Sequence, residues 1–190
     1  MNRYLSSVSD ESALDAAVRP AVTGEEPWLV LPPALAIPPG AGAICDEAGA
    51  RRIGRGAAEG AFTTAPVMVA HASLTARRLG LAPPPRSADL LDVLELFAFV
   101  RPARFCAPSP SGLALALGMS EPKGAEAQAV ALRHAADALL RELADPAYPR
   151  REDAMTLNET LSKAGWGWSW RVSGALQHQP MRARQYRGSG

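Results

Sequence analysis

The sequence predicts an α/β protein in which a small sheet and its helices are followed by further helices. The apolar run Val67–Ala70 directly follows Pro66 and is typical of a buried strand. The helical segment after it ends at Gly80, a residue suited to the left-handed conformation that closes a helix. Farther along, Ala125–Leu143 repeats apolar residues at helical spacing. With 190 residues, the chain is long enough to form one domain with a hydrophobic core.

The N-terminal region begins with a polar segment and continues into two short apolar runs. Residues 1–26 are polar and acidic, and we expect them to form a loosely ordered arm. The stretch Trp28–Ile37 contains the runs WLVL and ALAI, which are separated by Pro32 and Pro33. Because proline cannot donate a hydrogen bond within a sheet, at most one of the two runs is expected to be a central strand.

A β-hairpin is predicted next. The apolar segment Ala43–Cys45 leads into the turn sequence DEAG and a returning strand that reads ARRIGRG. Asp46 and Glu47 are adjacent, so on a strand their side chains would point to opposite faces. We therefore interpret this acidic pair as turn residues and not as metal ligands. The following segment, Gly56–Thr64, is expected to be helical or irregular.

Two further helices are predicted in the middle of the chain. Apolar residues recur at i, i+4 and i+7 within Asp89–Val100, which indicates an amphipathic helix closed by Pro102. Ser109 and Pro110 are suited to be the N-cap and first residue of another helix, which ends at Gly118.

The C-terminal part is predicted to be helical. After Ala125–Leu143, a helix is expected over Arg151–Ala164, with Ala154, Leu157 and Leu161 along its apolar side. The tryptophans that follow alternate with small residues, a spacing that fits a strand, but the apolar residues beyond them also fit a helix. We favour a helix packed against the preceding one. The expected organisation is an arm at 1–26, an α/β domain at 27–145, a helical extension at 146–180 and a basic tail at 181–190.

Composition and charge exclude several classes of protein. The net charge of +1 gives no whole-molecule signature of nucleic-acid binding, so any basic surface must be local. No apolar run approaches the ~20 residues of a membrane helix, and the N-terminus lacks the apolar core of a secretory signal. Cys45 and Cys106 are too few for a disulfide framework or a zinc site, and we expect both to be small buried apolar residues. These features favour a reduced cytoplasmic protein with no membrane partner.

The order of these elements resembles the middle of a DEDD-type 3′–5′ exonuclease domain. The resemblance is carried by VAH-x8-G, D-x-L-E-L and GLALALG, and it covers roughly Trp28–Leu143. More narrowly, the chain resembles the exonuclease-like segment at the N-terminus of a bacterial DinG-type ATP-dependent DNA helicase. The resemblance implies an RNase H-like mixed sheet flanked by helices. It also implies that a motor using ATP and magnesium follows Gly190 and unwinds DNA during repair or replication.

Exonucleases of this family hold two divalent cations with four carboxylates, and this sequence lacks the first two sets of ligands. The first motif is Asp-x-Glu on the first strand, yet no acid occurs between Pro27 and Cys45. In the second motif, His71 occupies the position of the leading histidine, but Ala76 replaces the metal-binding aspartate. We interpret His71 as a structural hydrogen-bonding residue at a strand end and not as a catalytic base.

The third motif is also degenerate. Lys123 and Gln128 occupy the positions of its general-base histidine and last aspartate, when the long helix is aligned on Ala129. Asp92 remains in D-x-L-E-L, but the family does not use that position to bind metal. Without the carboxylates, divalent ions have no oxygen ligands, so no catalytic residue, metal site or cofactor is expected in this segment. The chain also has no G-x4-G-K-[ST] motif and is therefore not itself the ATP motor.

Tryptophans and arginines near the C-terminus are the candidates for contact with DNA. Bases stack on aromatic rings and arginines neutralise phosphates. The candidate residues are Trp166, Trp168, Trp170, Arg171, Arg182, Arg184 and Arg187. In the alternative interpretation, which we favour for the tryptophans, these rings close the core of a helical hairpin and the arginines lie in a solvated end.

The sequence thus predicts a non-catalytic, nucleic-acid-associated accessory domain of a DNA helicase, with DNA and the downstream motor of the same chain as its partners. Two alternatives stay open. One is a divergent 3′–5′ exonuclease with different metal ligands. The other is a protein-interaction module, which an exposed apolar patch near the tryptophans would favour.

Overall fold

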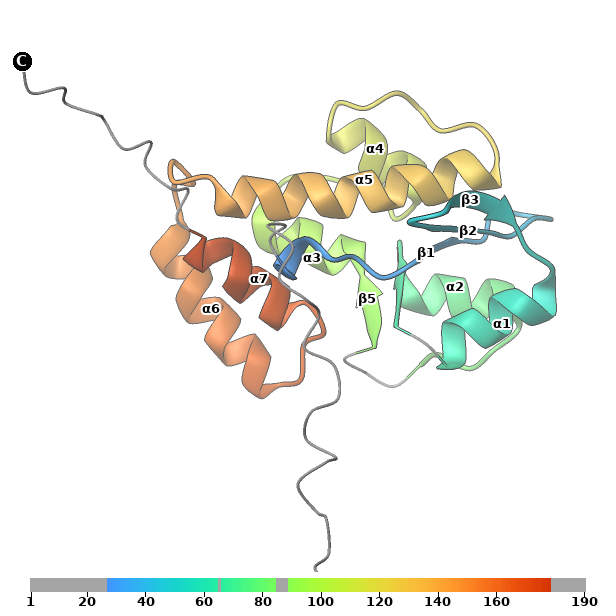
Figure 1. Cartoon of the computed structure of the whole chain (residues 1–190), viewed down its shortest axis with the longest axis horizontal. Helices are drawn as coiled ribbons and strands as arrows, with labels where there is room; N and C mark the ends of the chain where they lie inside the picture. The colour runs from blue at the N-terminus through green and yellow to red at the C-terminus, as the bar shows by residue number, and fades with distance from the viewer. Residues whose placement is uncertain (1–26, 65, 85–88, 179–190) are drawn as a thin grey trace, which may run out of the picture.

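A computed structural model describes residues 27–64, 66–84 and 89–178 (Figure 1), and it contains a five-stranded mixed sheet with helices on both faces. The strands are β1 (Ala34–Ala36), β2 (Ala43–Asp46), β3 (Gly49–Arg52), β4 (Val67–Val69) and β5 (Leu90–Asp92). Their order in the sheet is β3-β2-β1-β4-β5. Strands β1, β4 and β5 are parallel to one another, and β2 pairs antiparallel with β1 and β3. The prediction of an α/β fold followed by C-terminal helices is confirmed.

The helices begin and end close to the predicted capping residues. They are the 3-10 helix η1 (Pro27–Leu29), α1 (Arg55–Thr64), α2 (Ala72–Leu79), α3 (Val93–Val100), α4 (Pro110–Ala116), α5 (Ala125–Ala144), α6 (Arg151–Lys163) and α7 (Ser169–Gln177). Gly80 ends α2 in the left-handed conformation, with φ 75°. The Ser109 hydroxyl accepts a hydrogen bond from the backbone N–H of Gly112 at 3.0 Å and so caps α4.

The N-terminal predictions are confirmed in outline. Of the two apolar runs near Trp28, the first forms η1 and the second forms β1, which is the central strand of the sheet. The hairpin is β2 and β3. Asp46 is the last residue of β2 before the turn, where Oδ1 accepts from the N–H of Ala48 at 2.9 Å and Oδ2 pairs with Arg51 at 2.6 Å.

The prediction of one helix over Asp89–Val100 was wrong at its start. Leu90–Asp92 is strand β5, and α3 begins only at Val93. The reason is tertiary, because Leu90 and Leu91 pair with residues of β4 in parallel register. Asp92 then caps α3, so the backbone changes from strand to helix at this residue.

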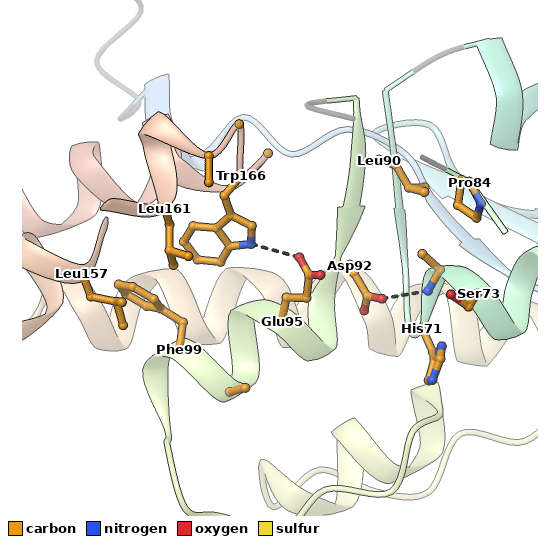
Figure 2. A pocket seen from close by; sticks show the side chains of 15 residues that line it. His71, Ser73, Pro84, Leu90, Asp92, Glu95, Phe99, Leu157, Leu161 and Trp166 are labelled. Carbon is orange, nitrogen blue, oxygen red and sulfur yellow. Dashed lines mark hydrogen bonds between the residues drawn. The ribbon is translucent and has the colours of Figure 1, made fainter. Parts of the chain in front are cut away.

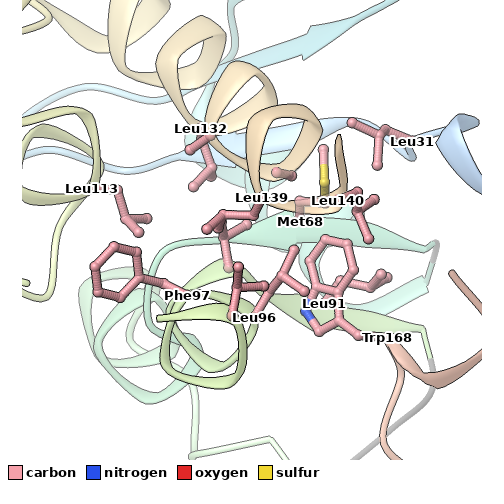
Figure 3. Close-up of a cluster of buried hydrophobic side chains, with 14 of the residues drawn as sticks. Leu31, Met68, Leu91, Leu96, Phe97, Leu113, Leu132, Leu139, Leu140 and Trp168 are labelled. Carbon is pink, nitrogen blue, oxygen red and sulfur yellow. The ribbon is translucent and has the colours of Figure 1, made fainter. Parts of the chain in front are cut away.

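Two cores lie on opposite faces of the sheet, as the alternation of side chains along each strand requires. On one face Met68 and Leu91 pack under α5, together with apolar residues of α3 and α7. Figure 3 shows this cluster, with Leu139 and Trp168 among its members. On the other face Val67, Val69 and their neighbours pack against α1 and α2.

The C-terminal helices form a hairpin that packs back on the domain. Helix α7 contacts α6, α5 and η1, so the predicted helix is confirmed and the alternative of a strand is wrong. The apolar side of α6 differs from the prediction, because Leu157 is 47% exposed and Asn158 is buried instead. The Asn158 amide donates to the Ser169 carbonyl at 3.2 Å and to the Ser173 hydroxyl at 2.8 Å. None of the described helices is both long and apolar enough to cross a membrane.

The close approach of α7 to η1 predicts opposite effects for two glycine-to-alanine substitutions. A Cβ at position 174 would overlap Cβ of Trp28 and lie 2.7 Å from its Cγ, whereas a Cβ at position 60 on α1 would meet nothing within 4 Å. We expect Gly174→Ala to lower the free energy of unfolding by about 1–3 kcal/mol through overpacking. Gly60→Ala should raise it by about 0.5–1 kcal/mol, because alanine favours helix. Urea denaturation measures both, and a stabilising Gly174→Ala would contradict the packing described.

Candidate functional site

A groove of about 710 Å³ lies at the carboxyl ends of β4 and β5 (Figure 2). Its walls come from the start of α2, one side of α3, the end of α6 and the connection from α6 to α7. The carboxyl ends of neighbouring parallel strands are where open α/β sheets commonly bind ligands. This groove is therefore the candidate functional site.

Asp92 is the central residue at the polar end of the groove. Its Oδ2 accepts a hydrogen bond from the N–H of Ala72 at 2.7 Å, and its Oδ1 accepts from the N–H of Leu94 at 3.0 Å. One carboxylate thus caps two helices, α2 and α3. Burial raises the pKa of Asp92 above its ordinary value, although these two backbone hydrogen bonds act in the opposite direction.

His71 connects β4 to α2 in a backbone conformation that is unusual for a side chain other than glycine. Its φ is 119°, and its Nδ1 accepts a hydrogen bond from the N–H of Leu74 at 3.2 Å. Because Nδ1 is the acceptor, a neutral ring carries its proton on Nε2. This is the structural hydrogen bond that the sequence predicted for His71, and such strained backbone is frequent at binding sites.

The other end of the groove is apolar and aromatic. Phe99 and Trp166 lie with ring centroids 5.0 Å apart at an interplanar angle of 35°. Leu157 and Leu161, both from α6, complete this end. The Trp166 Nε1–H donates to Oε2 of Glu95 at 3.0 Å, so one hydrogen bond joins the aromatic end to the acidic end (Figure 2).

The charge of the groove is negative. Asp92 and Glu95 both line it, and none of its described lining residues is a lysine or an arginine. Glu95 forms no ion pair with a described residue. The groove therefore presents carboxylates that favour a cationic group and oppose phosphate.

The residues aligned with the exonuclease motifs lie in different environments. Ala76 is fully buried on α2, Lys123 is exposed before α5, and Gln128 is partly exposed on α5. His71 and Asp92 line the groove together, but both serve as helix caps. No group of three His, Cys, Asp or Glu side chains in the described part of the chain is arranged to hold a metal ion.

The candidate nucleic-acid residues lie in different environments. Trp168 is fully buried and donates from Nε1 to the Asp92 carbonyl at 2.8 Å, so its ring presents no surface for stacking in this structure. Trp170 is 53% exposed, with the Arg171 guanidinium 4.5 Å from its ring centroid.

Arg171 is held by the backbone, whereas the arginines of the tail are not described. Its Nε and Nη2 donate to the Val30 carbonyl at 3.2 and 3.1 Å. Burial lowers the pKa of Arg171 to about 10, so it stays charged at neutral pH. Arg182, Arg184 and Arg187 lie outside the described residues.

The groove was not predicted from the sequence, although one sequence feature pointed to it. Asp92 and Glu95 are three residues apart at the start of α3, a spacing related to the capping box, and this spacing places both acids at one helix end. Phe99 is one turn farther along the same helix. The contribution of Leu157 and Trp166 could not be anticipated, because it depends on how α6 and α7 return to α3.

The polar groups at the polar end of the groove are engaged in hydrogen bonds with the backbone. Both oxygens of Asp92 and Nδ1 of His71 accept hydrogen bonds from backbone N–H groups, so these groups hold helices in place. Ser73 is exposed and lines the same groove. Comparison with protein-family models, curated proteins and solved structures found no match.

The two caps formed by Asp92 predict a large effect of its removal. We expect Asp92→Ala to lower the free energy of unfolding by about 1–3 kcal/mol, because α2 and α3 each lose a cap and buried N–H groups lose their partners. The matched control is Asp153→Ala, which removes an exposed acid from the first turn of α6 and should cost less than about 1 kcal/mol. Equal costs in urea denaturation would contradict the double cap.

The raised pKa of Asp92 predicts a pH dependence with a definite sign. The folded protein binds the Asp92 proton more tightly than the unfolded chain, so this contribution to stability is fully present below the unfolded pKa of about 3.9. It is lost as the pH rises through the raised folded pKa. Asp92→Asn cannot titrate, so the difference in unfolding free energy, wild type minus variant, should fall as pH rises across this window. A difference that rises with pH would contradict the direction of the shift.

Proposed function

We propose that this chain is a degenerate, RNase H-like exonuclease domain that performs no chemistry and serves as an accessory domain of a DinG-type DNA helicase. The mixed sheet, with helices on both faces, supports this proposal because the exonuclease resemblance implies such a sheet. The long helix α5 packs across β1 and β2, which brings the first strand and the last motif helix together. In the proposed parent protein, ATP and magnesium belong to the motor.

The observation that carries the proposal is the set of residues at the three motif positions. The first strand, β1, is made only of buried alanine and leucine. Ala76 is fully buried where the second motif needs a carboxylate. Lys123 and Gln128 stand where the third motif has its histidine and its last aspartate. Two divalent cations need several oxygen ligands, and these side chains supply no carboxylate.

A protein-interaction module is the second candidate function, and the groove favours it. Phe99, Leu157 and Trp166 give the groove an apolar end, and Asp92 and Glu95 give it negative charge. Such a surface opposes a phosphate backbone, so any contact with DNA falls to other parts of the chain. The arginines at 182, 184 and 187 remain the candidates.

A nuclease assay tests the proposed lack of chemistry. With Mg²⁺ or Mn²⁺, the protein should release no labelled nucleotide from single- or double-stranded oligonucleotides, and calorimetry should detect no Mn²⁺ binding. The reason is the missing carboxylate set.

Asp92→Asn and Glu95→Gln serve as matched variants in this assay, because they remove the two groove carboxylates with little change in shape. Cleavage by the wild type that either variant abolishes would establish the divergent exonuclease instead. Cleavage unchanged in both variants would point to a contaminating nuclease, which repurification and an in-gel activity assay at the protein's own mass would separate from this chain.

The proposed association with DNA predicts a salt-dependent contact by the tail. On single-stranded DNA each neutralised phosphate contributes about 0.7 to the slope of log K against log salt. Replacing Arg182, Arg184 and Arg187 with glutamine should therefore reduce the magnitude of this slope by about 2. Fluorescence anisotropy with a labelled oligonucleotide measures the slope, and Arg52→Gln, which removes an exposed arginine already paired with Glu126, is the control. No salt-dependent binding by the wild type would contradict the DNA association.

A further inference from the structure

The groove brings together an exposed leucine, a partly exposed tryptophan and an exposed carboxylate. Leu157 is 47% exposed on α6 although apolar, and it lines the groove at the end where Phe99 and Trp166 lie (Figure 2). Glu95 lies beside these rings, is exposed, and uses Oε2 to accept from Trp166. A ligand that fills the groove would therefore meet an apolar surface and a carboxylate side by side.

The chemistry of the groove argues against three other occupants. Nucleic acid would place phosphates against Asp92 and Glu95, which costs electrostatic energy. A divalent cation would find Glu95 as its main free carboxylate, because both oxygens of Asp92 already accept backbone N–H groups. A second copy of the chain, related by twofold symmetry, would bring the same carboxylates to face one another.

We propose that this groove binds a linear segment of a partner protein in which an apolar side chain lies close to a lysine or arginine. The apolar side chain packs on the groove surface formed by Leu157 and the partly exposed Trp166 ring. The basic group pairs with Glu95, which has no cationic partner among the described residues. Charge complementarity selects the basic residue of the partner, and the apolar surface of the groove binds the partner's apolar side chain. The inference extends the proposed accessory role by giving the class of partner. It does not depend on the chain being related to exonucleases.

The experiment uses the full chain and short synthetic peptides labelled with fluorescein. The peptides carry Leu and Arg on a Gly/Ser background, with the spacing between Leu and Arg varied. Matched peptides replace Arg with Glu or Leu with Ser. We expect at least one Leu/Arg peptide to bind, and each matched replacement to weaken binding by about fivefold or more.

Two variants, each with a matched control, locate the site on the protein. Leu157→Asp should weaken binding about tenfold, because it places an acid in the apolar end. Met155→Asp is its control: Met155 is 41% exposed on the same helix but does not line the groove, so binding should change by less than about twofold. Glu95→Gln keeps an oxygen that can accept from Trp166 while removing the charge, and it should weaken binding about two- to fivefold and reduce its salt dependence. Glu152→Gln, on the exposed start of α6, should leave binding unchanged.

A spectroscopic readout separates local binding from loss of folding. The Trp166 indole N–H cross-peak in a ¹H–¹⁵N spectrum, identified by its loss in Trp166→Phe, should shift when the Leu/Arg peptide is added to the wild type. The same spectrum would reveal a variant that is unfolded. If Leu157→Asp does not fold, Glu95→Gln, which leaves the core unchanged, provides the test.

Several results would overturn the proposal. They are the absence of binding by every Leu/Arg peptide, binding that Leu157→Asp and Glu95→Gln leave unchanged, or a Trp166 cross-peak that responds only to single-stranded DNA or to dimer formation. If the chain binds the peptides but cleaves DNA, the proposed function is refuted and this inference stands. If the chain neither cleaves DNA nor binds any peptide, this inference is refuted and the proposed function stands.

Discussion

The carboxylate of Asp92 is the point on which the arrangement of the sheet and its helices depends. The two carboxylate oxygens cap α2 and α3. The backbone carbonyl of the same residue accepts a hydrogen bond from the indole N–H of Trp168. A residue at the end of β5 is thereby joined to the helix that follows β4 and to the C-terminal hairpin. Because the carboxylate is partly withdrawn from water, its hydrogen bonds are worth more than they would be in bulk solvent. The polar end of the groove is fixed by these same bonds.

Local sequence chemistry predicted most of the elements, and tertiary contacts decided the rest. The caps at Gly80 and Ser109 and the turn at Asp46 depend on nearest neighbours in the chain, so they could be recognised without a structure. Strand β5 could not, because two leucines followed by an aspartate satisfy either a helix or a strand. Pairing with β4 decided between them. The exposure of Leu157 was likewise missed, since α7 covers the side of α6 that carries Asn158.

The regular spacing of the three tryptophans in the sequence does not place their rings on one face of the structure. Trp166, Trp168 and Trp170 alternate in sequence, but the chain changes direction between α6 and α7, so the three rings do not share a face. One lines the groove, one is buried in the core and one lies on the surface beside Arg171. The sequence identified this segment as important but could not assign separate roles to its rings. Of the three, Trp166 is the ring that lines the groove, where it lies against Phe99 of α3.

The contact between η1 and α7 also determines how the domain would carry mechanical load. Gly174 allows α7 to lie directly against Trp28, and the Trp28 ring is 5.4 Å from that of His178. The first and last described segments are thus held together. Tension applied between these two segments would load the contact of α7 with η1. Because the connection that leads into α7 supplies Trp166 to the groove, loss of the contact with η1 would also loosen the aromatic end of the groove.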